Sequence, residues 1–214
     1  MDYLVLDDFT PLSLQNQLET MIMYNDQVTW GYREQTAGVD GVDWNEVDPN
    51  IRETWMLQHD IFGIDVGVRN QMSFDLAKTN IFFLEHYLGK SIKMLQRIKA
   101  NMTVKMSEHK GCHHPPHVDV GNGDAFSMVY YLHDNTEGDT IIFDKKYNPT
   151  NPSTKQHEGL KELVRVSPKK GRAVVFPSNR FHASSIPWES ERRCIINYVF
   201  FADKDLLDGI PSTS

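Results

Sequence analysis

The stretch FSMVYYLHDNTEGDTIIF, residues 126–143, places two short β-rich segments on either side of a turn-forming cluster. The same alternation continues from about residue 102 to residue 201. Val, Ile, Tyr and Phe favour strands, whereas Gly, Asn and Asp favour turns. Strands are therefore predicted at 102–106, 117–120, 126–132, 140–143, 163–167, 172–176 and 194–201. Such a run predicts a mainly β fold with flanking helices, a double-stranded β-helix of the cupin-like jelly-roll type, which encloses a small-molecule site.

Three residues in this run could hold a divalent metal: His117, Asp119 and His182. Two imidazoles and one carboxylate are the ligand set of non-heme Fe(II) oxygenases, and they leave coordination positions open. With nine histidines in the chain, a lone His-x-Asp is expected about once by chance, so the surrounding pattern must support it. Arg192 and Arg193 follow His182, and a guanidinium there could hold the far carboxylate of a dicarboxylic cosubstrate.

The chain resembles the Fe(II)- and 2-oxoglutarate-dependent dioxygenases, in particular their prolyl-4-hydroxylase-like branch. The resemblance covers most of the chain and is strongest from Arg97 to Phe201. It rests on the motif His117-Val118-Asp119 and on the segments 129–132, 137–143, 166–176, 181–183 and 193–197. The resemblance implies that His117, Asp119 and His182 bind Fe(II) and form the catalytic centre, with 2-oxoglutarate as cosubstrate and O2 as oxidant.

The implied activity is hydroxylation of an unactivated C–H bond in a peptide or a small molecule, with release of succinate and CO2. Peptidyl proline is one candidate substrate. Asp119 is informative here, because relatives that halogenate carry a small residue in place of the carboxylate. Its presence in this chain therefore favours hydroxylation.

Only one of the two arginines can face the site, because side chains alternate along a strand. Arg193 shares a face with Ile195 and Asn197, and relatives commonly carry Asn four residues after the cosubstrate-binding Arg, so Arg193 is assigned this role. Arg192 shares its face with residues that are equally consistent with core packing. Tyr131 matches a Tyr of close relatives that bonds the same carboxylate, but an ordinary strand aromatic would look identical.

A second group of metal-capable residues precedes the motif and consists of His109, Cys112, His113 and His114. A structural zinc site usually combines four Cys and His ligands at characteristic spacings, and no second pair completes one here. These residues are therefore expected to line the entrance of the pocket.

The first half of the chain is expected to support the jelly roll and to contribute to recognition. Helices are predicted at 11–23 and 73–88, and a further short helix at 91–98. Residues 25–70 lack clear periodicity, and Trp30 and Tyr32 within them either form a substrate-facing wall or, as favoured, anchor the segment to the core. Residues 144–159 are interpreted as a lid over the substrate mouth or as a solvated insertion.

The size and charge of the chain limit its expected domain number, binding partners and cellular location. The 214 residues fit a single oxygenase domain, with supporting helices and a recognition segment over 1–100 and a jelly-roll core over 101–203. A net charge of −7 is opposite to that of nucleic-acid-binding domains. The first residues lack the features of a signal peptide, and no stretch is long and apolar enough to span a bilayer. Two cysteines are too few for a disulfide framework. A cytoplasmic location is therefore expected.

The expected partners are 2-oxoglutarate and an unidentified peptide or small-molecule substrate. A different class of function, a non-catalytic metal-binding cupin-like sensor or interaction module, is the alternative. Such a module has no need of Arg193 and Tyr131. A third reading, another cupin enzyme such as an isomerase or a cosubstrate-free dioxygenase, usually carries more imidazoles.

Overall fold

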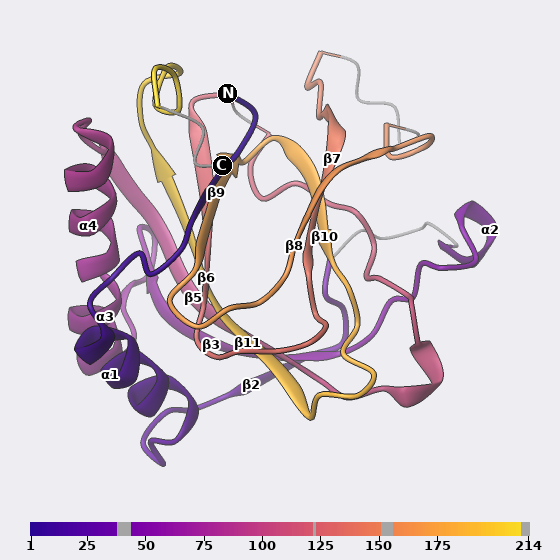
Figure 1. The fold of residues 1–214 in the computed structure, drawn as a ribbon, viewed down its shortest axis with the longest axis horizontal. Helices are drawn as coiled ribbons and strands as arrows, with labels where there is room; N and C mark the ends of the chain where they lie inside the picture. Colours follow the sequence, from indigo (N-terminus) through magenta and orange to yellow (C-terminus); the bar gives the residue numbers. More distant parts are fainter. Residues whose placement is uncertain (38–43, 122, 151–155, 211–214) are drawn as a thin grey trace.

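Two antiparallel sheets face each other in the computed structural model, which describes residues 1–37, 44–121, 123–150 and 156–210 (Figure 1). The larger sheet has eight strands in the order β1 (Leu4–Leu6), β9 (Ala173–Pro177), β6 (Ala125–Tyr131), β11 (Arg192–Phe201), β5 (Met94–Val104), β3 (Met56–Gly63) and β2 (Gly31–Arg33), with β4 (Gly67–Val68) beside β3. The smaller sheet consists of β10 (Arg180–Ser184), β7 (Thr140–Lys146) and β8 (Glu162–Val166). The predicted jelly-roll fold is confirmed.

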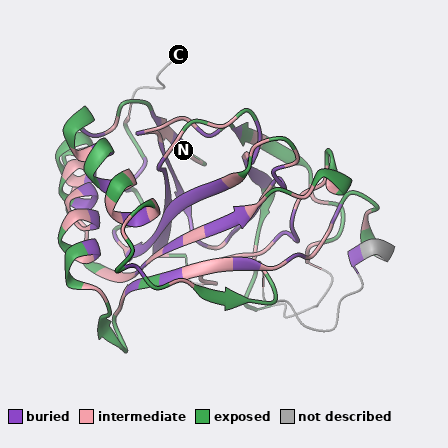
Figure 2. Cartoon of the chain, turned by 90° about the horizontal axis from the view of Figure 1, so that it is seen from below, coloured by how far each residue is buried: buried purple, intermediate pink, exposed green. Residues whose placement is uncertain are grey.

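Three helices cover the outer face of the larger sheet: α1 (Leu12–Met23), α3 (Gln71–Ala77) and α4 (Thr79–Leu88) (Figures 1 and 2). The Asn70 side chain caps α3 by accepting a hydrogen bond from the Ser73 amide. Gly89 ends α4 in the left-handed conformation, which glycine adopts without strain. The helices predicted at 11–23 and 73–88 are confirmed, although the second is divided at Lys78. The short helices α2 (Trp44–Val47) and η1 (Ser107–His109) lie apart from this layer.

The central strands β5, β6 and β11 present alternate residues to two different environments. Their even-numbered residues face the helices and form the main core with Leu18, Ile22, Ile81 and Leu84. Full burial of one such apolar side chain stabilises the fold by roughly 1.5–3 kcal/mol. Two buried tyrosines on this face also bond the helical layer, Tyr130 to the Thr10 hydroxyl and Tyr198 to the Ala77 carbonyl. The odd-numbered residues face the smaller sheet, so the helices fix the sheet and leave its inner face for a site.

The prediction of a short helix at 91–98 is wrong, because β5 begins at Met94. From residue 97 onward polar and apolar residues alternate, and this period of two is a strand pattern. The strand predicted at 102–106 is the end of β5. The strand predicted at 117–120 is also absent from the described chain, where His117 forms an isolated bridge with His182. By contrast, β1, β2, β3, β4 and β10 were not predicted.

The segment 25–70 is more regular than expected, since it contributes β2, β3 and β4 to the larger sheet. Trp30 packs against the helix-side core, as the anchoring interpretation expects, whereas Tyr32 is 60% exposed. Residues 151–155 of the segment interpreted as a lid lie outside the described residues. The lid, like the single-domain organisation with a division near residue 100, stays a prediction.

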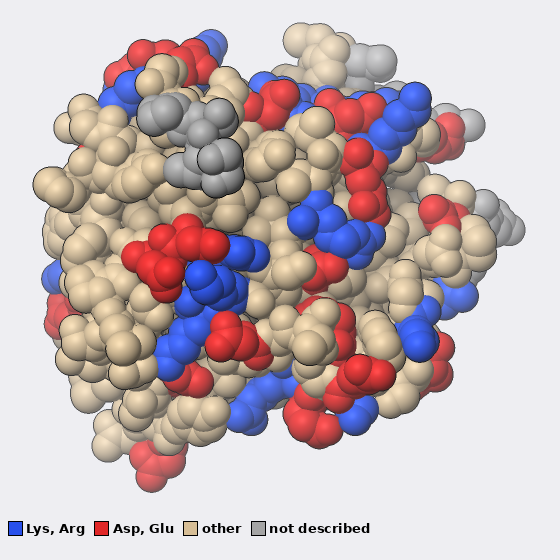
Figure 3. All heavy atoms as spheres, viewed as in Figure 1, with Lys and Arg blue, Asp and Glu red and all other residues tan. Residues whose placement is uncertain are grey.

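Acidic and basic side chains are interspersed on the face of the molecule seen in Figure 3. Two adjacent lysines illustrate this mixing, since Lys169 pairs with Asp7 and Asp8 and Lys170 pairs with Glu19. The exposed pairs of Lys169 contribute about 0–1 kcal/mol each, so they affect solubility more than stability. The described helices include none with the length and apolar character needed to cross a membrane.

Candidate metal and cosubstrate site

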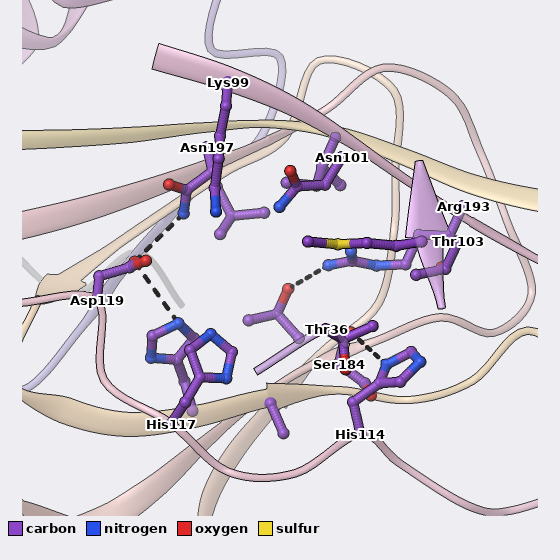
Figure 4. Close-up of a pocket in the computed structure, with 16 residues that line it drawn as sticks. Thr36, Lys99, Asn101, Thr103, His114, His117, Asp119, Ser184, Arg193 and Asn197 are labelled. Carbon is purple, nitrogen blue, oxygen red and sulfur yellow. Dashed lines mark hydrogen bonds and ion pairs between the residues drawn. The ribbon is translucent and has the colours of Figure 1, made fainter. Parts of the chain in front are cut away.

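The structure brings His117, Asp119 and His182 together in a pocket between the two sheets (Figure 4). His182 lies on β10, while His117 and Asp119 precede β6. Reciprocal backbone hydrogen bonds of 2.9 Å join His117 and His182, and the ligand atoms of the three residues lie within 4.8 Å of one another. Residues 65 positions apart therefore form one compact group because the bridge holds them there.

Both imidazoles are oriented for metal binding by backbone carbonyls. His117 Nδ1 lies 3.2 Å from the Pro115 carbonyl, and His182 Nδ1 lies 3.0 Å from the Arg180 carbonyl. A carbonyl only accepts hydrogen bonds, so each Nδ1 carries the proton and each Nε2 keeps a free lone pair. His182 Nε2 lies 3.6 Å from Asp119 Oδ2. This donor set fits a divalent metal such as Fe(II), which binds neutral imidazoles and carboxylates.

The protonation states also suit a metal. Burial lowers the pKa of His117 to about 3 and lowers that of His182, so both rings are neutral near pH 7. Burial alone would raise the pKa of Asp119, but His182, Arg97 and Lys99 hold it well below its ordinary value. A charged carboxylate beside two neutral imidazoles is ready to accept a cation without losing protons.

Three further residues position the Asp119 carboxylate. Arg97 donates to Oδ1 at 2.8 Å, while Ser127 and Asn197 donate to Oδ2 at 2.6 and 3.3 Å. Outer partners of this kind fix the orientation of a metal ligand. Sequence reasoning did not find Arg97 or Ser127. Of these two residues, only Arg97 could have been found from the sequence, because it begins the alternation of polar and apolar residues that marks β5.

Arg193 also lines this pocket, and its guanidinium is buried. Its Nε donates to the Gly138 carbonyl at 2.5 Å and its Nη2 donates to the Thr140 hydroxyl at 3.0 Å. Gly138 has φ 89°, and a Cβ there would lie 2.9 Å from Arg193 Cδ, so glycine gives the arginine its space. Arg192 instead points outward and places its guanidinium 5.4 Å from the centre of the Tyr24 ring. The expected alternation therefore places Arg193 in the pocket, and its role there stays a prediction.

Tyr131 lies behind the pocket rather than in its lining. Its hydroxyl is hydrogen-bonded to the Thr140 hydroxyl at 2.6 Å and donates to the Val166 carbonyl at 3.0 Å. Thr140, which sequence reasoning missed, lines the pocket and joins Tyr131 to Arg193. The proposed contact of Tyr131 with a cosubstrate carboxylate stays a prediction, and Thr140 is the hydroxyl that faces the pocket.

The histidines upstream of the motif have structural partners. His114 is 1% exposed, lines the pocket, and contacts the Thr54 hydroxyl at 2.9 Å and the Ser184 carbonyl at 3.0 Å. His113 Nδ1 contacts the His114 carbonyl. Within the described parts of the chain, the three-residue group of His117, Asp119 and His182 is the one set placed to hold a metal. The zinc alternative therefore has no geometric support there.

We expect the metal-free protein to lose stability in mild acid because of His114. Burial lowers the pKa of His114 from 6.5 to about 3, so the unfolded chain takes up a proton between these values that the folded chain does not. The stability is therefore present above pH 6.5 and is lost as the pH falls through this window. At pH 5 this loss is about 2 kcal/mol.

Urea unfolding of the metal-free protein at pH 7.5 and pH 5 measures this effect. The difference between the two unfolding free energies should be about 2 kcal/mol smaller in His114→Gln than in the wild type. Substitution of the exposed His86 by Gln is the matched control and should leave the difference unchanged. Equal pH dependence in wild type and His114→Gln would show that His114 is not held neutral by its surroundings.

Comparison with known proteins agrees with this geometry. Residues 102–200 match the family described as the 2OG-Fe(II) oxygenase superfamily. No match was found among curated proteins. Among solved structures, the fold is similar to a prolyl hydroxylase from Trichoplax adhaerens in complex with a hypoxia inducible factor peptide fragment, at 16% identity and TM-score 0.57, over 98% of this chain and 87% of the other.

Two further structures share the fold. A prolyl-4-hydroxylase from Pseudomonas putida has 18% identity and TM-score 0.52, over 94% of this chain and 93% of the other. The α-ketoglutarate-dependent epimerase SnoN from nogalamycin biosynthesis has 13% identity and TM-score 0.62, over 100% and 87%. At these identities the similarities show the fold alone.

The superfamily uses Fe(II), 2-oxoglutarate and O2, and the pocket contains a donor set that fits the metal. The matched residues include His117, Asp119, His182 and Arg193. Residues 102–200 are therefore assigned to the 2OG-Fe(II) oxygenase superfamily.

Proposed function

We propose that this oxygenase hydroxylates an unactivated C–H bond of a peptide or a small molecule and releases succinate and CO2. In this proposal His117, Asp119 and His182 bind Fe(II), and Arg193 holds 2-oxoglutarate. The observation that carries it is one pocket with two free Nε2 atoms, an ionised carboxylate and a buried arginine. A non-catalytic metal-binding module has no use for that buried arginine.

The residues of this chain would each serve a separate task. His117, Asp119 and His182 would hold the metal through three ligand atoms and leave further coordination positions free. Arg193 would bind the far carboxylate of 2-oxoglutarate through two parallel N–H donors, with Thr140 as a neighbouring hydroxyl. Bound Fe(II) and 2-oxoglutarate together supply the activation of O2 for C–H oxidation. The surrounding apolar residues Val129 and Ile195 would limit the access of water.

Two observations support hydroxylation and a peptide substrate. The carboxylate of Asp119 is present and hydrogen-bonded, which disfavours halogenation. The fold is also shared with two prolyl hydroxylases, one of them in complex with a peptide fragment. Peptidyl proline is therefore the first substrate class to test, although a shared fold does not fix a substrate.

A cytoplasmic location is part of the proposal. Cys112 and Cys194 are both free thiols, which suits a reducing compartment where Fe(II) also persists.

The first experiment adds 2-oxoglutarate to the Fe(II)-loaded protein without oxygen. We expect a weak metal-to-ligand charge-transfer band in the visible spectrum, because the proposed chelate joins cosubstrate and metal. Admission of O2 should then convert 2-oxoglutarate to succinate, and proline-containing peptides should accelerate this conversion. A fully metallated protein that gives neither band nor succinate would exclude the proposed function.

A further inference from the structure

The inner face of β5 carries a row of polar side chains, Arg97, Lys99, Asn101 and Thr103. The residues between them, Ile98, Ala100 and Met102, belong to the helix-side core. Lys99, Asn101 and Thr103 line the pocket that contains the metal-binding group. A polar group that is removed from water destabilises the fold unless it is paired, so each member of the row needs a partner.

Arg97 has its partner, but Lys99 does not. Arg97 bonds Asp119, whereas no carboxylate or carbonyl of the described residues forms an ion pair or hydrogen bond with the Lys99 ammonium. Figure 4 shows the Lys99 side chain extending from its strand into the pocket, beside Asn197. Burial, followed by the neighbouring Arg97 charge, lowers the pKa of Lys99 to about 8. The ammonium therefore remains mostly charged at pH 7.

The strand register places Lys99 at the metal end of the pocket. Lys99 pairs with Asn197 across β5 and β11, and Asn197 donates to the metal-binding group at Asp119. Thr103, two pleats further along the strand, pairs with Arg193. The half-buried Lys99 and the buried Arg193 thus lie at opposite ends of the same row, and Lys99 is remote from the proposed far carboxylate of 2-oxoglutarate.

The charges in the pocket indicate that Lys99 lacks a paired anion. Asp119 is the one acidic side chain among the described residues that line the pocket. The proposed function would add a metal dication and a cosubstrate dianion, and the combined charge of Asp119, Arg193, metal and cosubstrate is then zero. Lys99 then has no direct ion pair: Asp119 and the cross-strand Asp60 attract its ammonium only through space, and a second cation, Arg97, lies beside it. A further anion would remove this imbalance.

Asn101 adds a second polar contact next to Lys99. Its Oδ1 atom is buried and has no hydrogen-bond partner among the described residues. The amide oxygen and nitrogen of an asparagine can exchange places by a flip of the side chain. In either orientation the side chain offers a hydrogen bond to a molecule that fills the pocket.

We propose that Lys99 determines substrate specificity by binding a carboxylate of the substrate, so that the molecule this enzyme oxidises is an acid held by Lys99 with Asn101 beside it. The proposal rests on the proposed function, since metal and cosubstrate are expected to fill the remainder of the pocket. Candidate substrates are therefore carboxylic acids, including a peptide whose acidic group lies near the oxidised carbon. A neutral substrate of the same shape should bind poorly.

The test uses acetate as the probe and the full chain loaded with Mn(II) and 2-oxoglutarate in the absence of O2. Paramagnetic broadening of the acetate methyl signal by Mn(II) reports binding near the metal. We expect acetate to bind the wild type and to bind Lys99→Met at least tenfold more weakly. Lys99→Arg should retain binding, and Lys105→Met, an exposed lysine just beyond the end of β5, should match the wild type. Acetamide should not bind any of the four proteins.

Several outcomes would overturn the proposal. If acetate does not bind the wild-type pocket, or binds Lys99→Met as tightly as the wild type, Lys99 binds no anion. Its role would then be only to balance the charge of Asp119. A tenfold loss of 2-oxoglutarate affinity in Lys99→Met would assign Lys99 to the cosubstrate instead. Failure of the wild-type Mn(II) protein to bind 2-oxoglutarate would reject the proposed function, and the acetate titration repeated without 2-oxoglutarate would still decide the role of Lys99.

Discussion

Replacing His182 with alanine should abolish metal-dependent turnover and weaken Fe(II) binding by more than about 100-fold. The variant loses one of three ligands, and loss of an outer partner of a metal ligand alone already weakens binding by about 10–100-fold. His182 Nε2 lies 3.6 Å from the Asp119 carboxylate and has its Nδ1 proton committed to the Arg180 carbonyl. No other imidazole of the described residues can take this place, since His114 bonds Thr54 and Ser184. Equilibrium titration with Mn(II) or Fe(II) without oxygen measures the loss.

The metal-free variant should remain folded. His182 is buried and packs its ring 4.8 Å from that of Phe176, so truncation lowers the free energy of unfolding by about 1–3 kcal/mol, which is within the usual range for a single substitution. Circular dichroism and urea unfolding check this, with His86→Ala as the exposed control. An unfolded His182→Ala protein would indicate a structural metal centre, and undiminished metal affinity would exclude His182 as a ligand.

The metal ligands could be predicted from the sequence because their residue types bind metals and two of them stand close together in the chain. His117 and Asp119 are two residues apart, and the distant His182 stands in a recognisable order with Arg193. The strands β6 and β11 were also predicted, since long apolar runs between turn residues indicate strands without knowledge of their tertiary partners. Arg193 was distinguished from Arg192 by the alternation of side chains along β11 and by Asn197, which stands four residues after it as in the family that the chain resembles.

The supporting residues could not be predicted because their roles depend on strand pairing. Ser127 is an unremarkable residue of β6 until β6 and β9 align it near Ser178 and Asp119. Thr140 matters because it lies between Tyr131 and Arg193, which are far from each other in sequence. Lys99 lies between the helix wrongly predicted at 91–98 and the strand predicted at 102–106, and only the register of β5 reveals that Asn197 is one of its neighbours. Tertiary pairing thus decides which polar residues of a strand face the site.

Replacing Arg193 with methionine should raise the dissociation constant of 2-oxoglutarate by at least about 100-fold, a change of about 2.7 kcal/mol. The guanidinium is the buried cation held at the Gly138 and Thr140 end of the pocket, and a bidentate pair with a carboxylate would be lost. Arg192→Met is the matched control, because that side chain lies outside the pocket against Tyr24. It should change the dissociation constant by less than about twofold. Isothermal titration of the Mn(II) proteins gives both values.

The same substitution should have the opposite effect on the protein without cosubstrate. Burial lowers the pKa of Arg193, which shows that its charge is unfavourably desolvated when no anion is bound. Methionine removes this buried charge, so the metal-free Arg193→Met protein should be as stable as the wild type or more stable. Addition of 2-oxoglutarate should then raise the unfolding temperature of the Mn(II)-loaded wild type and of Arg192→Met, but not that of Arg193→Met. If Arg192→Met loses the ligand-induced shift and Arg193→Met keeps it, the cosubstrate is held outside this pocket and the assignment of Arg193 is wrong.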